Sequence, residues 1–168
     1  MALAGLKQED QSYVIANRGL EGVQIASVAA TPLFLLHSIR TRTFSLRRLG
    51  RINWTLPLVG GGLGAAAGWV QASQTPPSVL ARRVAGLRQD VDRIRRDDFH
   101  LIGAVLGSLS LPALFLRRVG LVNGALGGLG LGGAIGVVTF YGMHYAGAHK
   151  TLEMPVSGEK PIPEVTAK

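Results

Sequence analysis

Cysteine is absent from this 168-residue chain, and charged residues make up only 17% of it. The absence of cysteine excludes disulfides, thiolate metal sites and thiol nucleophiles. Aromatic residues are scarce at 6%, and the arginines lie between apolar runs rather than on one polar face. The formal net charge of +8 therefore does not indicate nucleic acid, and we expect lipid headgroups or acidic neighbours as counterions.

Apolar residues and glycine are what the chain has in abundance: 47% of it is hydrophobic and 23 residues are glycine. A helix that crosses a bilayer needs about 20 mainly apolar residues. Four segments meet this need, at residues 20–39, 52–72, 99–116 and 121–145. We therefore expect an all-α membrane protein with four transmembrane helices.

A glycine-rich segment that follows an arginine pair occurs twice, 70 positions apart. Residues 46–62 and 116–132 are identical at eight aligned positions. Such a repeat predicts two copies of one structural unit, here two repeated Gly-rich hairpins. The two hairpins begin after zero and two spans, so both begin on the same side of the membrane and the repeats are parallel rather than inverted. The identical pairs include Arg47 with Arg117, Arg48 with Arg118, Gly50 with Gly120, and Asn53 with Asn123.

These patterns divide the chain into five parts. A polar N-terminal segment (1–19) carries neither a secretory signal nor a typical presequence. The first transmembrane hairpin (20–72) is followed by an amphipathic loop helix (73–98) and the second transmembrane hairpin (99–146). A proline-bearing tail (147–168) is expected to run extended.

One apolar stripe runs along the middle loop, with members four and three residues apart, which predicts a helix with a single apolar face. Pro76 and Pro77 end the second span, and Ser78 is expected to cap the new helix. We expect the stripe to lie on lipid or on a neighbouring protein, with a short dimerising coiled coil as the alternative. The stripe comprises Leu80, Val84, Leu87, Val91 and Ile94.

Glycine recurs every four residues in the second and fourth segments. Small residues at this spacing let helix backbones approach closely, which matters in lipid because van der Waals packing must hold helices together there. We expect the strips to pack these two spans within the chain, with docking against another membrane protein as the alternative. The predicted helix-packing residues are Gly60, Gly64, Gly68, Gly124, Gly128, Gly132 and Gly136.

The two short loops are basic and contain no acid. Lys and Arg accumulate in short loops on the inner side of membranes, so we place both loops inside. Arg47, Arg48, Arg117 and Arg118 are predicted to set the topology and to contact lipid headgroups.

Residues that could carry chemistry are few. Glu21 is the nearest candidate for an intramembrane acid, and we place it at the membrane interface. Asp97 and Asp98 suit the N-terminus of the third span, and no base or ligand accompanies them as a catalytic pair would require. We expect no catalytic, cofactor or metal site, and no charged residue at mid-depth between the two halves. A small transporter or lipid-handling enzyme remains an alternative, based on Glu21 and the scattered histidines.

The segment 11–19 (QSYVIANRG), together with the two arginine pairs and Asn53 and Asn123, resembles a fungal accessory membrane subunit of mitochondrial respiratory complex I, NADH:ubiquinone oxidoreductase. The resemblance implies a multi-pass protein of the mitochondrial inner membrane. It also implies a non-catalytic role in assembly or stability, with core and accessory membrane subunits of complex I as partners. We expect a structural phospholipid, with cardiolipin as a candidate, and no nucleic-acid partner.

The four spans, the glycine strips and the basic short loops are also similar to the Tim17-type family of inner-membrane protein translocases. That resemblance implies the same compartment and a translocase component as the alternative function. The acidic residues of this chain, however, lie in a differently spaced, arginine-rich helix, which counts against protein import.

Overall fold

The structure is a computed structural model that describes residues 2–147, and the side chains of residues 7–147. Helix accounts for nearly all of this part of the chain, so the all-α prediction is confirmed. Residues 148–168, which hold most of the predicted extended tail, lie outside the described residues. The five helices are α1 (Ala2–Thr41), α2 (Leu46–Gln74), α3 (Pro77–Gln89), α4 (Val91–Val119) and α5 (Leu121–Tyr145).

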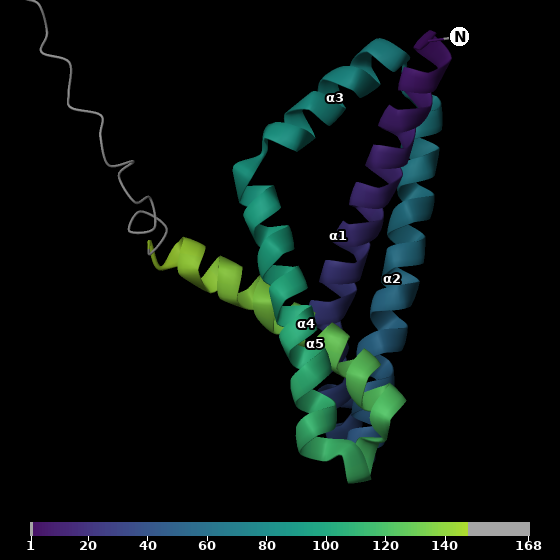
Figure 1. Ribbon diagram of the computed structural model, residues 1–168. Coiled ribbons are helices and arrows are strands. Elements are labelled where there is room, and N and C mark those ends of the chain that lie inside the picture. Colours follow the sequence, from purple (N-terminus) through teal and green to yellow (C-terminus); the bar gives the residue numbers. More distant parts are fainter. Residues whose placement is uncertain (1, 148–168) are drawn as a thin grey trace, which may run out of the picture.

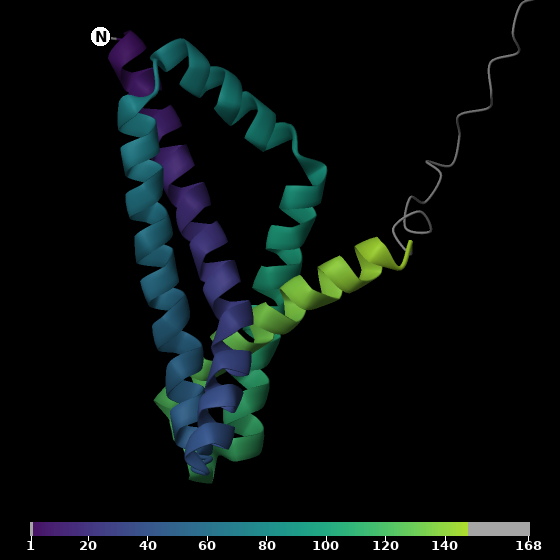
Figure 2. The same cartoon turned by 180° about the vertical axis from the view of Figure 1, so that it is seen from behind.

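The long helices form two antiparallel hairpins, α1 with α2 and α4 with α5 (Figure 1). The turn of the first hairpin, at residues 42–45, and that of the second, at Gly120, lie at the same end of the molecule, while α3 lies at the other end (Figures 1 and 2). Gly120 has a φ of +81°, which glycine adopts readily because it has no Cβ. The two hairpins meet mainly where α2 packs on α5.

The apolar face of α3 is covered by the chain itself. Leu80 and Val84 are buried against Val14 of α1 and Ala72 of α2. The guanidinium of Arg88 also lies over the ring of Tyr13, 5.0 Å from its centroid. The expectation that this stripe lies on lipid or on a neighbouring protein is therefore wrong for its first half.

The helix predicted for residues 73–98 ends at Gln89, because Asp90 adopts a non-helical conformation. Asp90 is extended, with φ −76° and ψ 94°, and its Oδ1 accepts a hydrogen bond from the backbone N–H of Arg93 at 3.1 Å. This is the geometry of a helix N-cap, so α4 begins at Val91, well before the predicted third span. Val91 and Ile94 consequently belong to α4, where both are exposed. Ser78 likewise lies inside α3, whose N-cap is Pro76.

Two features shape the second hairpin. Phe115 has non-helical angles, φ −126° and ψ 20°, three residues after Pro112 within α4. Proline removes a backbone donor and clashes with the turn that precedes it, so Pro112 does not account for a distortion on its C-terminal side. Helix α5 runs diagonally across the other helices, and its C-terminal part projects away from the α1–α2 hairpin (Figures 1 and 2).

Three helices of the described chain are long and apolar enough to cross a membrane: Lys7–Thr41, Val91–Val119 and Leu121–Tyr145. The four predicted spans are therefore not all confirmed by length and composition. Helix α2 is long enough, with 29 residues, but its many glycines add almost nothing to its hydropathy. Large apolar side chains are nevertheless exposed on all four long helices, including Ile39, Leu63, Leu106 and Val122. Surface of this kind is normally covered by lipid or by another protein.

Candidate functional site

The first hairpin is held together by close backbone contact between α1 and α2. A Cβ added at Gly60 would overlap the carbonyl oxygen of Gly22, and one added at Gly64 would overlap that of Arg18. At Gly68 it would lie 3.0 Å from the Cα of Ile15. No larger residue fits at these approaches without displacing backbone, so the predicted strip on α2 faces α1.

The second hairpin uses the same device on α4 and α5. A Cβ at Gly128 or Gly132 would overlap the carbonyl oxygen of Gly107 or Gly103, respectively. Gly136 lies in the same way against the carbonyl of Phe99, and Gly124 packs on Pro112. The predicted strip on α5 therefore faces α4.

The contact between the hairpins uses other glycines of α5. A Cβ at Gly127 would meet the backbone of Gly50 at 2.6 to 3.0 Å, and one at Gly130 would overlap the carbonyl of Asn53. Helices α2 and α5 thus do pack within the chain, as predicted, but through Gly127 and Gly130 rather than through the two strips.

The repeated asparagines lie in this region and make different bonds. The Asn53 side chain is buried, with its Nδ2 donating to the Leu49 carbonyl at 2.9 Å and its Oδ1 accepting from Thr31 Oγ1 at 2.9 Å. Asn123 Oδ1 accepts from Trp54 Nε1 at 3.4 Å. Asn53 therefore ties α2 to α1, and Asn123 ties α5 to α2.

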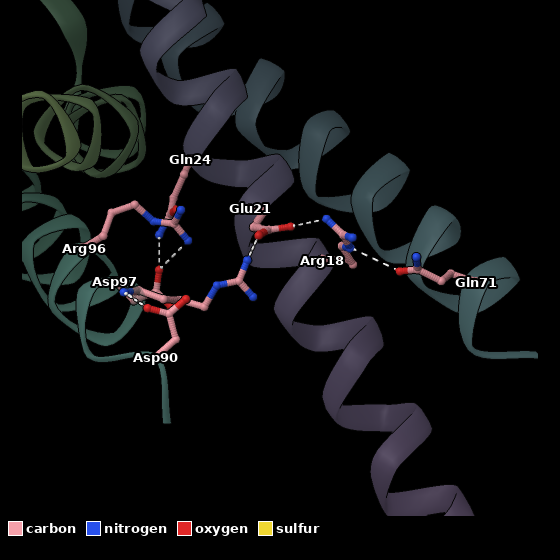
Figure 3. A network of polar contacts seen from close by, with 8 residues as sticks. Arg18, Glu21, Gln24, Gln71, Asp90, Arg96 and Asp97 are labelled. Atoms are coloured by element: carbon pink, nitrogen blue, oxygen red, sulfur yellow. Dashed lines mark hydrogen bonds and ion pairs between the residues drawn. The ribbon is translucent and has the colours of Figure 1, made fainter. Parts of the chain in front are cut away.

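A cluster of charged and amide side chains lies between α1 and α4 (Figure 3). Glu21 pairs with Arg93 of α4, and it accepts a hydrogen bond from Arg18 Nη1 at 2.8 Å (Figure 3). The Glu21 and Arg93 side chains are only 17% and 15% exposed. Burial of charge is costly unless the charge is paired, so this pairing is what allows Glu21 to lie here.

A second bridge lies beside the first. Gln24 Nε2 donates to Asp97 Oδ1 at 2.7 Å, and Arg96 Nη2 lies 3.3 Å from the same oxygen. The Arg18 Nε also donates to Gln71 Oε1 of α2, at 3.4 Å (Figure 3). We call the eight residues drawn in Figure 3 the charged cluster: Arg18, Glu21, Gln24, Gln71, Asp90, Arg93, Arg96 and Asp97.

The charged cluster is a contact between the two halves that was not predicted from the sequence. It was not predicted because Glu21 and Arg93 are 72 positions apart, and no local pattern reports a contact at that separation. A signal was nevertheless present: Glu21 and Gln24 are three residues apart, as are Arg93 and Arg96, so each pair shares one helix face.

Three glycines that face the two strips from the partner helices, Gly22, Gly103 and Gly107, were not predicted from the sequence. Their signal was available for the second hairpin, because Gly103 and Gly107 are four residues apart and match the spacing of the strip on α5. The four predicted headgroup residues, Arg47, Arg48, Arg117 and Arg118, are all exposed at the end of the molecule where the two turns lie.

Within residues 7–147, no group of three or more His, Asp or Glu side chains is placed to hold a metal ion. The His100 ring is buried against Gly133, where an added Cβ would lie 2.5 Å from its Cε1.

Comparison with protein-family models, curated proteins and solved structures found no significant match to this chain.

Proposed function

We propose that all four long helices cross a membrane and that the chain is an accessory subunit of the membrane arm of mitochondrial respiratory complex I. The observation that carries the membrane part of this proposal is the exposed apolar surface of α4. Only 11% of the most apolar 18-residue stretch of α4 is buried within the chain, against 50% of the corresponding stretch of α5. A helix so apolar and so little covered needs lipid or partner helices around it.

The inclusion of α2 among the spans is supported by its packing on α1. Its 29 residues correspond to about 43 Å of helix, longer than the roughly 30 Å hydrocarbon core of a bilayer. Because Gly60, Gly64 and Gly68 lie against the backbone of α1, α2 lies at the same depth as α1. Leu58 and Leu63 on its outer side are each 68% exposed, as on a helix that faces lipid.

The place in complex I is supported by the resemblance of residues 11–19 and of the repeated arginine pairs. A scaffold role fits the described interior, in which glycine contacts and the charged cluster join helices to one another. The glycine strips lie in the contacts within the two hairpins and are not available to a partner protein. Contact with core and accessory subunits is therefore assigned to apolar side chains of α4, among them Leu101, Val105 and Leu109.

The test is a native-gel separation of inner-membrane extracts with mass spectrometry of each band. We expect the chain to comigrate with the NADH-oxidising assembly. Val105→Arg, which places a charge on the outer face of α4, is expected to move most of the chain out of that band, because a charge in an apolar helix interface is strongly unfavourable.

The matched control is Arg83→Gln on α3, which changes an exposed side chain at the other end of the molecule and is expected to leave the band unchanged. Comigration with a protein translocase would support the Tim17-type alternative. Migration of the wild-type chain outside every large assembly would contradict both.

A further inference from the structure

A cavity of about 950 Å³ lies between α1, α4 and α5. Its lining includes residues of the C-terminal part of α5 and four members of the charged cluster, Arg18, Glu21, Gln24 and Arg96. Its volume falls at the upper end of the roughly 300–1,000 Å³ of small-molecule sites. The cavity is therefore large enough for one amphiphilic molecule.

The lining of the cavity changes in character along α1. Arg18 and Glu21 come first, and Gln24 marks the end of the polar part. Arg96 of α4 completes the polar part. One to two turns further along α1, the lining is apolar and consists of Val28 and Pro32 of α1 with Val137 and Val138 of α5. A polar end followed by an apolar channel matches the order of groups in a phospholipid, with the headgroup next to Arg18 and the acyl chain next to α5.

The charges at the polar end favour an anionic headgroup. Arg18 and Arg96 line the cavity together with a single acid, Glu21; Asp97, which lies 3.3 Å from Arg96, does not line it. Glu21 already pairs with Arg18 and Arg93. The Nε of Arg96 is buried and has no hydrogen-bond partner among the described residues. A phosphate at the cavity wall would accept charge-assisted hydrogen bonds from the guanidinium groups of Arg18 and Arg96.

We infer that this cavity binds one anionic phospholipid, with its phosphate at Arg18 and Arg96 and an acyl chain along α1 and α5. The inference rests on the membrane location proposed above and not on membership of complex I. It places the lipid headgroup at the end of the membrane-spanning region that is remote from the two turns and their arginine pairs.

The experiment uses the purified full chain in nanodiscs of equal amounts of phosphatidylcholine and phosphatidylglycerol, the latter with a diazirine in its acyl chain. After irradiation, adducts are mapped by mass spectrometry. They are expected to concentrate on Ile25, Val28 and Val138. Ala29→Trp, which fills the cavity, should remove this concentration, whereas Ala66→Trp on the exposed side of α2 should not.

Lipid retained after exchange into detergent is then counted by native mass spectrometry. Wild type is expected to retain one phosphatidylglycerol, and Arg96→Gln to lower its preference over phosphatidylcholine about ten-fold, the effect of losing one charge-assisted hydrogen bond. Arg82→Gln on α3 is the matched control and should retain the wild-type preference.

Adducts spread evenly over all exposed apolar residues, or equal retention of the two lipids by wild type, would overturn the inference. If Ala29→Trp does not fold, Val138→Phe tests the same cavity from α5. Because the discs contain no other subunit, failure of the native-gel test leaves this readout intact. Failure of the chain to insert into the discs would instead contradict the membrane proposal itself.

Discussion

Glycines along α2 differ in what surrounds them, although they lie close together in the sequence. A side chain at Gly60 would meet Gly22 and Ala26 of α1, whereas Gly62 has nothing within 4 Å of an added Cβ. Only the first glycine is therefore required for helix packing. At Gly62 the absence of a side chain offers no contact, and glycine there only lowers helix propensity.

This difference gives a prediction with its control in the same helix. Gly60→Ala should destabilise the folded chain by about 1–3 kcal/mol, because the added methyl group forces α1 and α2 apart. Gly62→Ala should be neutral or stabilising by up to about 1 kcal/mol, because alanine favours helix. Denaturant unfolding of the purified protein in mixed micelles, followed by circular dichroism, measures both. Equal losses for the two variants would show that the interface between α1 and α2 is not as described.

At the scale of helices, the residue pattern predicts where elements lie better than it predicts which elements meet. Both turns fall next to the arginine pairs, at 42–45 and at Gly120, because polar and glycine residues interrupt apolar runs there. The interruption between α3 and α4 at Asp90 was not predicted, because an aspartate within a charged stretch has no distinctive local pattern. Its role as N-cap becomes visible only in the structure, where its side chain accepts a hydrogen bond from the backbone N–H of Arg93. The charged cluster was missed because its contacts join distant segments.

The charged cluster adds a further contact between the hairpins, because its side chains bridge α1 and α4. Glu21→Gln removes the acid that pairs with Arg93 and leaves that guanidinium, whose side chain is 15% exposed, without its ion-pair partner. The expected loss of stability is about 3 kcal/mol, the lower end for breaking a buried ion pair. Arg18→Gln should cost less than about 1 kcal/mol, because the Arg18 side chain is 45% exposed.

Both variants are measured by denaturant unfolding, with the double variant Glu21→Gln/Arg93→Gln as a further test. If the pair is the cause, the double variant should be more stable than Glu21→Gln alone, since no buried guanidinium is then left unpaired. A double variant at least as unstable as the single one would assign the effect to packing instead.

At the scale of the whole molecule, the two basic turns lie together at one end, and α3 lies at the other (Figure 1). The seven arginines at or beside the turns (Arg40, Arg42, Arg47, Arg48, Arg51, Arg117 and Arg118) have no acid among them. The turns are the short loops of the four-span arrangement, and Lys and Arg in short loops beside the spans mark the inner side of a membrane. The seven arginines therefore predict that the turns face the inner side.

The absence of cysteine makes this arrangement directly testable, because a single introduced cysteine is the only thiol in the chain. Ser45→Cys and Leu121→Cys report on the two turns, and Ser73→Cys and Ser78→Cys report on the end of α2 and on α3. With four spans, a membrane-impermeant maleimide should label the first two only from the inner side and the other two only from the outer side. If α2 does not cross, Ser45→Cys and Ser73→Cys will react from the same side. Because α2 is packed backbone to backbone on α1, that result would require both helices of the first hairpin to lie outside the bilayer, leaving α4 and α5 alone to span it.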